Sequence, residues 1–259
     1  QYYESDWIIE PTQIDSLFIN KDELVPLKMD IKSTFAKDRI SEIGILPWHL
    51  KSMQYRLTRA FEKKDINSIL KISADFGHYI GDAHVPLHTT ENYNGQLTNQ
   101  VGIHAFWESR LPEIFADNTY DYFVGKAEYI DDPNAYFWDI VLDSHALLDS
   151  VLAIEQELQR TLPADQRYCF EQRGQTMIRT ECFEFAKLYH DRLDGMVETR
   201  MKAAIKSVGD VWYAAWVDAG QPDLNQLLSD YIPTAAEIQL EKEQAIQFKN
   251  GKIIGRKHD

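Results

Sequence analysis

Hydrophobic residues recur at helical spacing along much of the chain. Leu50, Met53, Leu57 and Phe61 follow one another at intervals of three and four, which is the spacing of one face of an α-helix. Pro47 suits the first turn of such a helix, because a proline in that position gives up no hydrogen bond. The pattern therefore predicts a helix that begins close to Pro47.

A second helix is predicted directly after the first. Asp65 belongs to the residue types favoured at a helix N-cap, and a hydrophobic face follows it, formed by Ile66, Ile69, Leu70 and Ala74. We expect this helix to run to Ala83 or beyond and to be kinked or ended by Pro86. Residues 89–102 are rich in Asn, Thr, Gln and Gly, which is typical of a loop.

Further stretches of the chain also show helical spacing. One helix is expected to start near Ile103, another opens at Pro133, and residues 164–206 predict one or two more with a break at Gly195. Two aromatic clusters are expected to line the core, namely Tyr136-Phe137-Trp138 and Trp212-Tyr213-Trp216. Because the alternating pattern of strands is scarce, the sequence predicts an all-α fold.

The same pattern suggests how the domain is organised. We expect a single multi-helix domain over residues 1–232, with a metal cleft between its helices. Residues 233–259 are charged and are expected to form a helical or disordered tail. No hydrophobic run reaches about 18 residues, so no transmembrane segment is expected.

Charge narrows the range of partners. The chain of 259 residues has 41 acidic and 27 basic side chains, for a formal net charge of −14. Stable binding to duplex DNA relies on basic patches, so it is not expected here. Bound divalent cations would change the sign of the local field, so a nuclease is not excluded.

Two features bear on the cellular compartment. The chain begins with Gln1 rather than Met, so either a leader has been removed or the sequence starts inside a longer protein. Its two cysteines, Cys169 and Cys182, are too few for a disulfide framework. They form either a single bridge, if the protein is exported, or two semi-buried thiols on a helix.

The middle of the chain concentrates groups that bind metals. His78 and Asp82 are four residues apart, and so are His104 and Glu108. On a helix each pair projects from one face, with Cβ atoms about 5–6 Å apart. His88 could complete a site begun by His104 and Glu108, since the polar loop lets the two segments face each other. Imidazole and carboxylate are ligands that zinc accepts.

Ordinary polar pairs are the competing interpretation. A single pair at this spacing is usually a surface hydrogen bond or a helix salt bridge. Three such pairs on adjacent segments, the third being His84 and His88, favour a metal. His84 points to a different face from His78, so we expect it at the surface or behind the ligands. The remaining histidines are expected to be structural or solvent-facing: His49, His145, His190 and His258.

The arrangement of these motifs resembles a known superfamily. The chain contains Gly77-His78-Tyr79-Ile80-Gly81-Asp82-Ala83-His84-Val85-Pro86-Leu87-His88, then Asn92-Tyr93-Asn94-Gly95, then His104-Ala105-Phe106-Trp107-Glu108. This pattern, HxxxDxxxPxH followed by a loop and HxxxE or HxxxD, is similar to that of the zinc-dependent phospholipases C, whose superfamily also includes single-strand-specific zinc nucleases. The resemblance covers residues 46–115.

The resemblance implies a fold, a cofactor and a reaction. It implies an all-α protein with up to three zinc ions in a cleft. His88, His104 and Glu108 would hold one zinc, and His78 and Asp82 would serve the other two, with Asp82 as the bridging ligand. A metal-bound hydroxide would then attack a phosphodiester, either a phospholipid or a single-stranded nucleic acid. Related enzymes are exported, which implies a secreted or periplasmic protein.

The amino-terminal part departs from the superfamily. Its members carry further ligands there, beginning with a terminal Trp, whereas this chain starts with Gln1 and has no histidine before His49. As the sequence stands, only the site of His88, His104 and Glu108 is complete. Either a preceding segment supplies the missing ligands, which we favour, or the protein keeps one zinc and has lost the catalytic pair.

These alternatives correspond to different functions. The favoured interpretation is a zinc-dependent phosphodiester hydrolase, and the second is a zinc-stabilised structural or binding protein with a degenerate catalytic site. A third, weaker hypothesis is a phosphohydrolase that uses the adjacent residues His190 and Asp191.

Four aromatic residues lie near the predicted ligands in the sequence, namely Tyr79, Tyr93, Phe106 and Trp107. They could contact lipid or stack on a base. For Tyr79 and Trp107, packing in the core is favoured instead.

Overall fold

The computed structural model of the protein describes residues 44–231, 233–235, 238–239, 242–243 and 245–246. These residues belong to one of the two units into which the chain divides, Ile43–Asp259. The expected boundaries of the domain and of the tail stay predictions, because residues 1–43 and most of the tail lie outside this set. Within it, no helix has the length and hydrophobicity needed to cross a bilayer.

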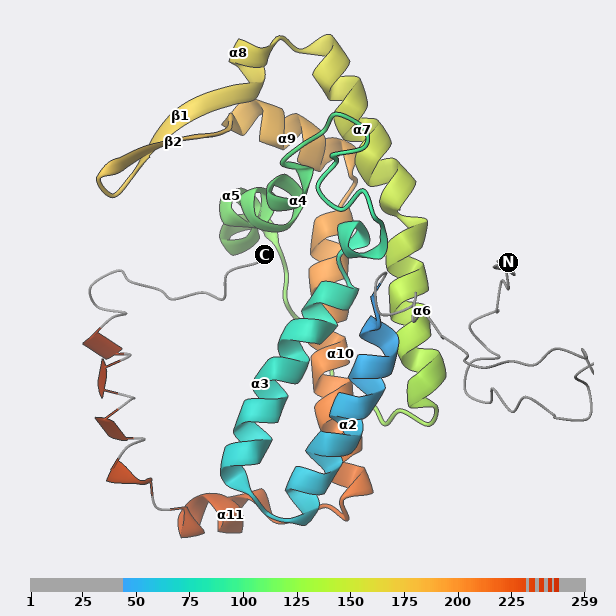
Figure 1. Ribbon diagram of the computed structural model, residues 1–259, viewed down its shortest axis with the longest axis vertical. Helices are drawn as coiled ribbons and strands as arrows, with labels where there is room; N and C mark the ends of the chain where they lie inside the picture. Colours follow the sequence, from blue (N-terminus) through green and yellow to red (C-terminus); the bar gives the residue numbers. More distant parts are fainter. Residues whose placement is uncertain (1–43, 232, 236–237, 240–241, 244, 247–259) are drawn as a thin grey trace, which may run out of the picture. The chain divides into compact units, whose positions relative to one another are not determined.

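The predicted all-α class is confirmed, because the described residues are mostly helical. Four helices run alongside one another (Figure 1). Helix α2 (Leu46–Glu62) packs against α3 (Ile66–Ala83), and α10 (Met196–Asp218) contacts both, while α6 (Pro133–Ala146) packs against α2. They enclose one hydrophobic cluster, whose fully buried members include Leu50, Leu57, Phe76, Ile80, Phe137 and Val211.

A second hydrophobic cluster lies beyond the end of α3. The 3-10 helix η3 (Pro86–Thr89) and the short helix α4 (Ile103–Ala105) contribute to it, together with α7 (Leu148–Thr161) and α9 (Phe183–Arg192). Its most buried members are Leu87, Leu111, Val151, Ala186, Tyr189 and Val197. The remaining helical elements of the described residues are η4 (Phe106–Arg110, a π-helix), α5 (Leu111–Thr119), α8 (Ala164–Arg167) and α11 (Leu224–Asp230).

The helix starts agree with the predicted caps. Helix α2 carries Pro47 in its first turn, and the Asp65 side chain caps α3 by accepting a 3.1 Å hydrogen bond from the Ser68 amide. The helical structure is also interrupted at Gly195, as expected. Gly195 directly precedes α10 and has a φ of +76°, a conformation that glycine adopts without a steric penalty. Local sequence therefore determines these boundaries.

One part of the predicted helical pattern is wrong. Residues 168–181 form an antiparallel hairpin of β1 (Tyr168–Arg173) and β2 (Thr176–Glu181), not a helix. Arg173 pairs with Thr176 across a turn at Gly174, whose φ is +61°. The turn glycine and the β-branched residues of β2 favour strands, and they override the helical spacing seen in the surrounding sequence.

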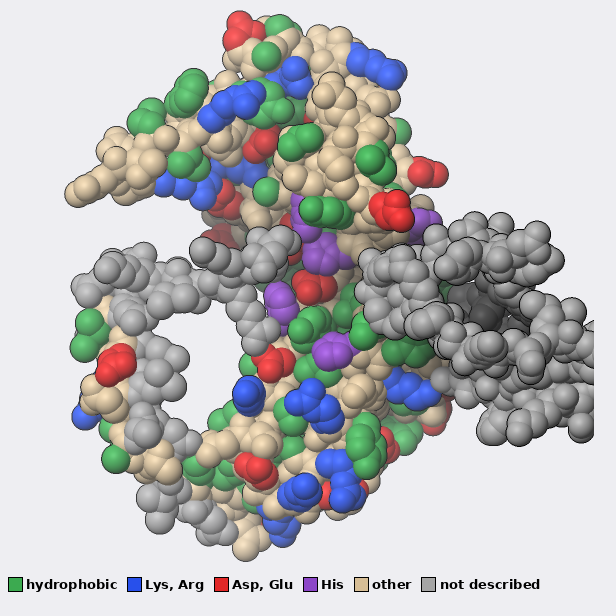
Figure 2. Space-filling model, in the orientation of Figure 1, with side chains coloured by type: hydrophobic (Ala, Val, Ile, Leu, Met, Phe, Trp, Pro, Cys, Tyr) green, Lys and Arg blue, Asp and Glu red, His purple; other side chains and the backbone are tan. Residues whose placement is uncertain are grey.

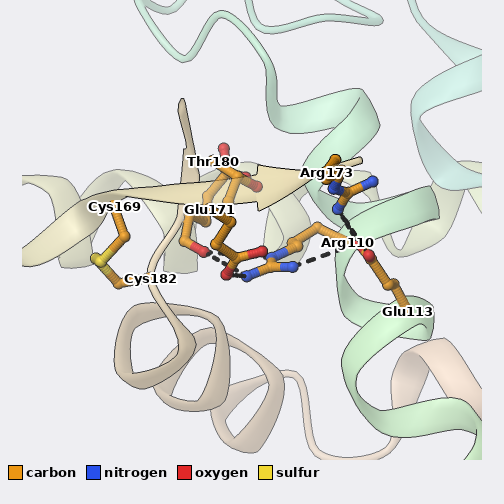
Figure 3. Close-up of polar contacts among 8 residues, drawn as sticks. Arg110, Glu113, Cys169, Glu171, Arg173, Thr180 and Cys182 are labelled. Atoms are coloured by element: carbon orange, nitrogen blue, oxygen red, sulfur yellow. Dashed lines mark hydrogen bonds and ion pairs between the residues drawn. A yellow bond between two sulfur atoms is a disulfide. The ribbon is translucent and has the colours of Figure 1, made fainter. Parts of the chain in front are cut away.

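The hairpin is fixed at its base by covalent and ionic links (Figure 3). Cys169 and Cys182 are joined by a disulfide, which decides between the two alternatives left open for the cysteines. Arg110, the last residue of η4, pairs with Glu171 on β1 and donates a 3.0 Å hydrogen bond from Nη2 to the main-chain oxygen of Glu181. The hairpin is therefore linked directly to the helical turn before α5.

Several hydrophobic residues expected in the core are exposed instead. Leu70 is 60% exposed, and Trp212 and Tyr213 are each 40% exposed. Helix α10 turns small residues toward the first cluster, namely Val211, Ala214 and Ala215. Since these pack closely against the neighbouring helices, the larger aromatic residues beside them are displaced toward the surface.

Candidate metal centre

The segment that carries His88 begins where α3 ends. Helix α3 includes both His78 and Asp82 and stops at Ala83. The chain then continues through Val85 into η3, whose first residue is Pro86. As predicted, the proline ends the helix, because it lacks the amide hydrogen that would continue the hydrogen-bond ladder. His88 therefore lies on a different element from His78 and Asp82.

Buried side chains from two other helices hold this break in place. The Ser144 hydroxyl on α6 donates a 2.6 Å hydrogen bond to the main-chain oxygen of Ala83. Nε of Arg200 on α10 donates a 3.0 Å hydrogen bond to the main-chain oxygen of His84. These carbonyl groups lack partners within α3, so their satisfaction from outside stabilises the break. Neither contact was predicted, because both partners are remote in sequence.

His84 is buried and does not lie at the surface. Its ring contacts the main-chain oxygen of Ile80 through Nδ1, at 2.8 Å, and the hydroxyl of Ser207 through Nε2, at 3.3 Å. Burial is the main cause that lowers the pKa of the His84 imidazole to about 4; the hydrogen bond with the Ile80 carbonyl opposes the shift, and the Arg200 guanidinium adds to it. The ring is therefore neutral at pH 7 and serves to pack the helix end.

A hydrogen-bonded loop connects the two segments that carry the candidate ligands. Gly95 has a φ of +72°, and a Cβ atom there would lie 2.3 Å from the main-chain oxygen of Gln100, so the tight turn requires glycine. The Gln100 side chain donates to the carboxylate of Glu155 at 2.6 Å and to the main-chain oxygen of Leu152 at 2.8 Å. These contacts anchor the loop on α7.

A π-helical turn carries Glu108. In η4 the Leu111 amide donates to the main-chain oxygen of Phe106, five residues earlier. Pro112 follows directly; it has no amide hydrogen for the Glu108 carbonyl, and its ring would crowd that oxygen in a regular helix. The wider turn relieves this conflict. Turns of this kind often accompany functional sites, and here the signal was already present in the sequence as Pro112.

Three of the five predicted ligands converge. Nε2 of His88 lies 2.9 Å from Nε2 of His104, and Oε2 of Glu108 lies 2.6 Å from the His104 nitrogen and 3.4 Å from the His88 nitrogen. Their side chains are between 21% and 31% exposed. Figure 2 shows histidine side chains gathered on one face of the molecule, with acidic and hydrophobic side chains among them. This group could hold a metal ion.

The carboxylate of this group is ionised. Burial acts to raise the pKa of Glu108, but hydrogen bonds and charge interactions with His104 and His88 outweigh burial and bring the pKa well below its usual range. An ionised carboxylate between two imidazoles is the form in which these groups bind a divalent cation. The cluster therefore presents a negative donor without first having to lose a proton.

His78 and Asp82 form a separate pair. Nε2 of His78 lies 3.5 Å from Oδ2 of Asp82, and the two side chains are 38% and 17% exposed. Among the described residues, neither belongs to a cluster of three or more donors. Their assignment as zinc ligands, with Asp82 as the bridge, stays a prediction.

The remaining candidate residues, His190 and the aromatic residues near the ligands, are mostly packed against other side chains. His190 contacts the Tyr120 hydroxyl at 2.8 Å, and its ring centroid lies 4.2 Å from that of Phe115 in a tilted arrangement, so it is packed between aromatic side chains. Phe106 and Trp107 are 2% and 3% exposed and belong to the second hydrophobic cluster. They cannot contact a substrate from there. Of the other two aromatic residues named near the ligands, Tyr79 is partly buried against the first hydrophobic cluster, and Tyr93 is 49% exposed.

Comparison of the chain with protein-family models, with curated proteins and with solved structures finds no match. The function is therefore inferred from the geometry of the site and from the motifs in the sequence.

Proposed function

We propose that this protein is a zinc-dependent hydrolase of phosphodiester bonds, phospholipase C-like or nuclease-like. The observation that carries the proposal is the convergence of His88, His104 and Glu108, which come from two segments separated by a polar loop. The resemblance of the motifs supports the same assignment. The disulfide between Cys169 and Cys182 supports the further proposal of an exported protein, because such bonds persist in oxidising compartments.

The donor set fits zinc. Two histidines and one carboxylate form one of the ligand sets found at catalytic zinc sites, where a fourth position stays open for water or substrate. Ligand atoms bonded to tetrahedral zinc at about 2.0–2.2 Å lie about 3.3–3.5 Å apart. The separations here are 2.6, 2.9 and 3.4 Å, so the two shorter ones need to lengthen by less than about 1 Å. The partly exposed side chains leave room for a further ligand.

The chain contributes position and charge to the reaction. Zinc held in such a site activates water and offsets the charge of phosphate oxygens. Glu108 supplies a negative donor, and the two imidazoles supply neutral ones. The anchored loop and the Arg200 contact at the end of α3 keep His88 and His104 on facing segments. The phosphodiester would approach from the solvent-exposed side of the cluster.

A side-by-side assay tests the proposal. The full-length chain is purified, its zinc content is measured, and hydrolysis of phosphatidylcholine, single-stranded DNA and a soluble aryl phosphodiester is followed. We expect about one zinc or more per chain and hydrolysis of at least one substrate. His104→Ala should abolish both properties, whereas His190→Gln, which alters a histidine of α9 outside the three-donor cluster, should leave both unchanged. Well under one zinc per chain would contradict the proposal.

A zinc-stabilised structural protein is the second candidate. The observation that favours it is the separation of His78 and Asp82 from the three-donor cluster among the described residues. Zinc would then join η3 to the turn formed by α4 and η4 without supporting a reaction. In that case zinc would raise the thermal midpoint of unfolding in the wild type but not in His104→Ala, and none of the three substrates would be cleaved.

A further inference from the structure

The loop between the candidate ligands has an inverted polarity. Two of its polar residues are buried, Asn92 at 6% exposure and Gln100 at 2%. Its hydrophobic residues face solvent, with Leu97 70%, Val101 68% and Tyr93 49% exposed. A loop in water normally shows the opposite distribution, because exposing hydrophobic surface is unfavourable. This distribution suggests that the exposed hydrophobic side chains of the loop contact a binding partner.

The exposed hydrophobic side chains belong to a fixed frame. The Leu97 amide donates a 2.7 Å hydrogen bond to Oδ1 of Asn92, and the Gly102 amide donates a 3.0 Å hydrogen bond to Oδ1 of Asn94. The buried Gln100 side chain ties the same loop to α7. The buried polar residues thus form the scaffold of the loop, and the hydrophobic ones are held outward. Fixed hydrophobic surface of this kind is typical of an interaction site.

The loop is continuous with the candidate metal centre. It joins η3, which carries His88, to α4, which carries His104. The ring of Tyr93 lies 6.1 Å from the ring of His104, centroid to centroid, in an edge-on arrangement. Whatever binds the exposed face of the loop is therefore brought next to the three-donor cluster.

The charge of the chain around this loop indicates what kind of surface the loop can bind. No Lys or Arg occurs between Lys71 and Arg110, whereas that stretch contains Asp75, Asp82, Glu91 and Glu108, and the whole chain has a net charge of −14. A polyanion such as single-stranded DNA gains most of its binding energy from basic side chains, as does an anionic membrane. Binding to a surface without net charge and with a hydrophobic interior does not require basic side chains.

We propose that residues 90–102, the docking loop, bind a zwitterionic phospholipid surface and bring the metal centre to the headgroups. The inference rests on the proposed function and narrows its substrate class to phospholipid. Leu97 and Val101 enter the boundary of the acyl chains, and Tyr93 takes the headgroup level, where an amphipathic ring is favourable. The phosphodiester bond of the headgroup then lies on the same side as His104.

The test measures vesicle binding without requiring catalysis. The full-length chain is sedimented with phosphatidylcholine vesicles in the presence of a chelator, so that neither zinc nor turnover affects the result. The double variant Leu97→Ser/Val101→Ser is compared with Phe170→Ser/Met177→Ser, which alters hairpin residues of similar exposure, 70% and 60%. We expect the loop variant to reduce the partition coefficient about tenfold or more and the hairpin variant to leave it unchanged.

Circular dichroism and the thermal midpoint show that both variants remain folded. The proposal is overturned if the wild type does not bind phosphatidylcholine vesicles, if the loop variant binds as well as the wild type, or if only the hairpin variant loses binding. Stronger binding to anionic than to zwitterionic vesicles also contradicts it. A lipid-free dimer that the loop substitutions dissociate would assign the docking loop to a second copy of the chain. Because the vesicle assay is run without zinc, its result does not depend on whether the protein is a zinc hydrolase. A failure of the proposed function and a failure of the docking proposal can therefore be told apart.

Discussion

Nε of Arg200 donates a 3.0 Å hydrogen bond to the main-chain oxygen of His84, at the point where α3 ends. The same guanidinium donates through Nη2 to the main-chain oxygen of Ile140, at 3.2 Å, and to the hydroxyl of Ser144, at 2.5 Å. One buried cation thus links α10, α6 and the end of α3. The turn toward His88 therefore depends on a residue remote from it in sequence.

Replacing this cation should destabilise the protein. In Arg200→Met, the buried carbonyl groups of His84, at the end of α3, and of Ile140, on α6, lose their donor. We expect the free energy of unfolding to fall by about 2–3 kcal/mol, measured by urea denaturation. The control variant Lys202→Met, on the same helix, removes a surface ion pair with Asp121 that is 3.8 Å long. It should change the free energy of unfolding by less than about 0.5 kcal/mol. Equal losses in both variants would contradict this role.

The buried imidazole of His84 should make stability depend on pH. Its pKa is about 4 in the folded protein because of burial, compared with about 6.5 in the unfolded chain. The unfolded state therefore binds more protons between these values, and stability falls as the pH is lowered from about 6.5 to 4, by up to about 3 kcal/mol. Urea titrations at a series of pH values measure this loss.

The variant His84→Gln isolates the contribution of that residue. It lacks the titrating ring but keeps a polar group of similar size, so its stability at pH 7 is lower while its slope between pH 6.5 and 4 is shallower than that of the wild type. Parallel pH profiles for the two proteins would show that other groups are responsible.

The disulfide of the hairpin should contribute measurable stability. Cys169 and Cys182 are 13 residues apart, and closing a loop of about this length stabilises a protein by about 2–3 kcal/mol, chiefly by restricting the unfolded chain. We expect Cys169→Ala/Cys182→Ala to lose this amount in urea denaturation. Adding a reductant should lower the stability of the wild type but not that of the double variant; an equal effect on both would argue against the bridge as the cause.

Zinc affinity should depend on Glu108 and not on a neighbouring carboxylate. Glu108→Gln removes the only charged donor of the cluster, so we expect the dissociation constant for zinc to rise about 100-fold or more, as measured by competition with a chromophoric chelator. Glu113→Gln provides the matched control, because Glu113 lies on α5 and pairs with Arg173. If the two variants bind zinc equally well, Glu108 is not a ligand.

The parts of the fold that were predictable depend on local chemistry. The starts of α2 and α3 follow from Pro47 and Asp65, and the end of α3 follows from Pro86, since each acts within one helical turn. The closeness of His104 and Glu108 also follows from their spacing in a helical turn. The approach of His88 was expected because a polar loop connects it to His104.

The parts that could not be predicted depend on contacts between distant segments. The buried role of His84 requires Arg200 and Ser207 on α10, and nothing near position 84 indicates them. The exposure of Leu70 likewise follows from which face of α3 its neighbours cover. The hairpin is a different case: Gly174, with a φ of +61°, permits its turn, but the helical spacing of the surrounding residues predicts a helix through this position.

The bridge between Cys169 and Cys182 encloses the whole turn of the hairpin, including the exposed Gly174. A protease that cut the chain at this turn would therefore leave both pieces covalently joined. Such a nicked molecule would migrate as one band in a denaturing gel without reductant and as two bands with it. Loss of the peptide bond there would not by itself release the carboxyl-terminal helices.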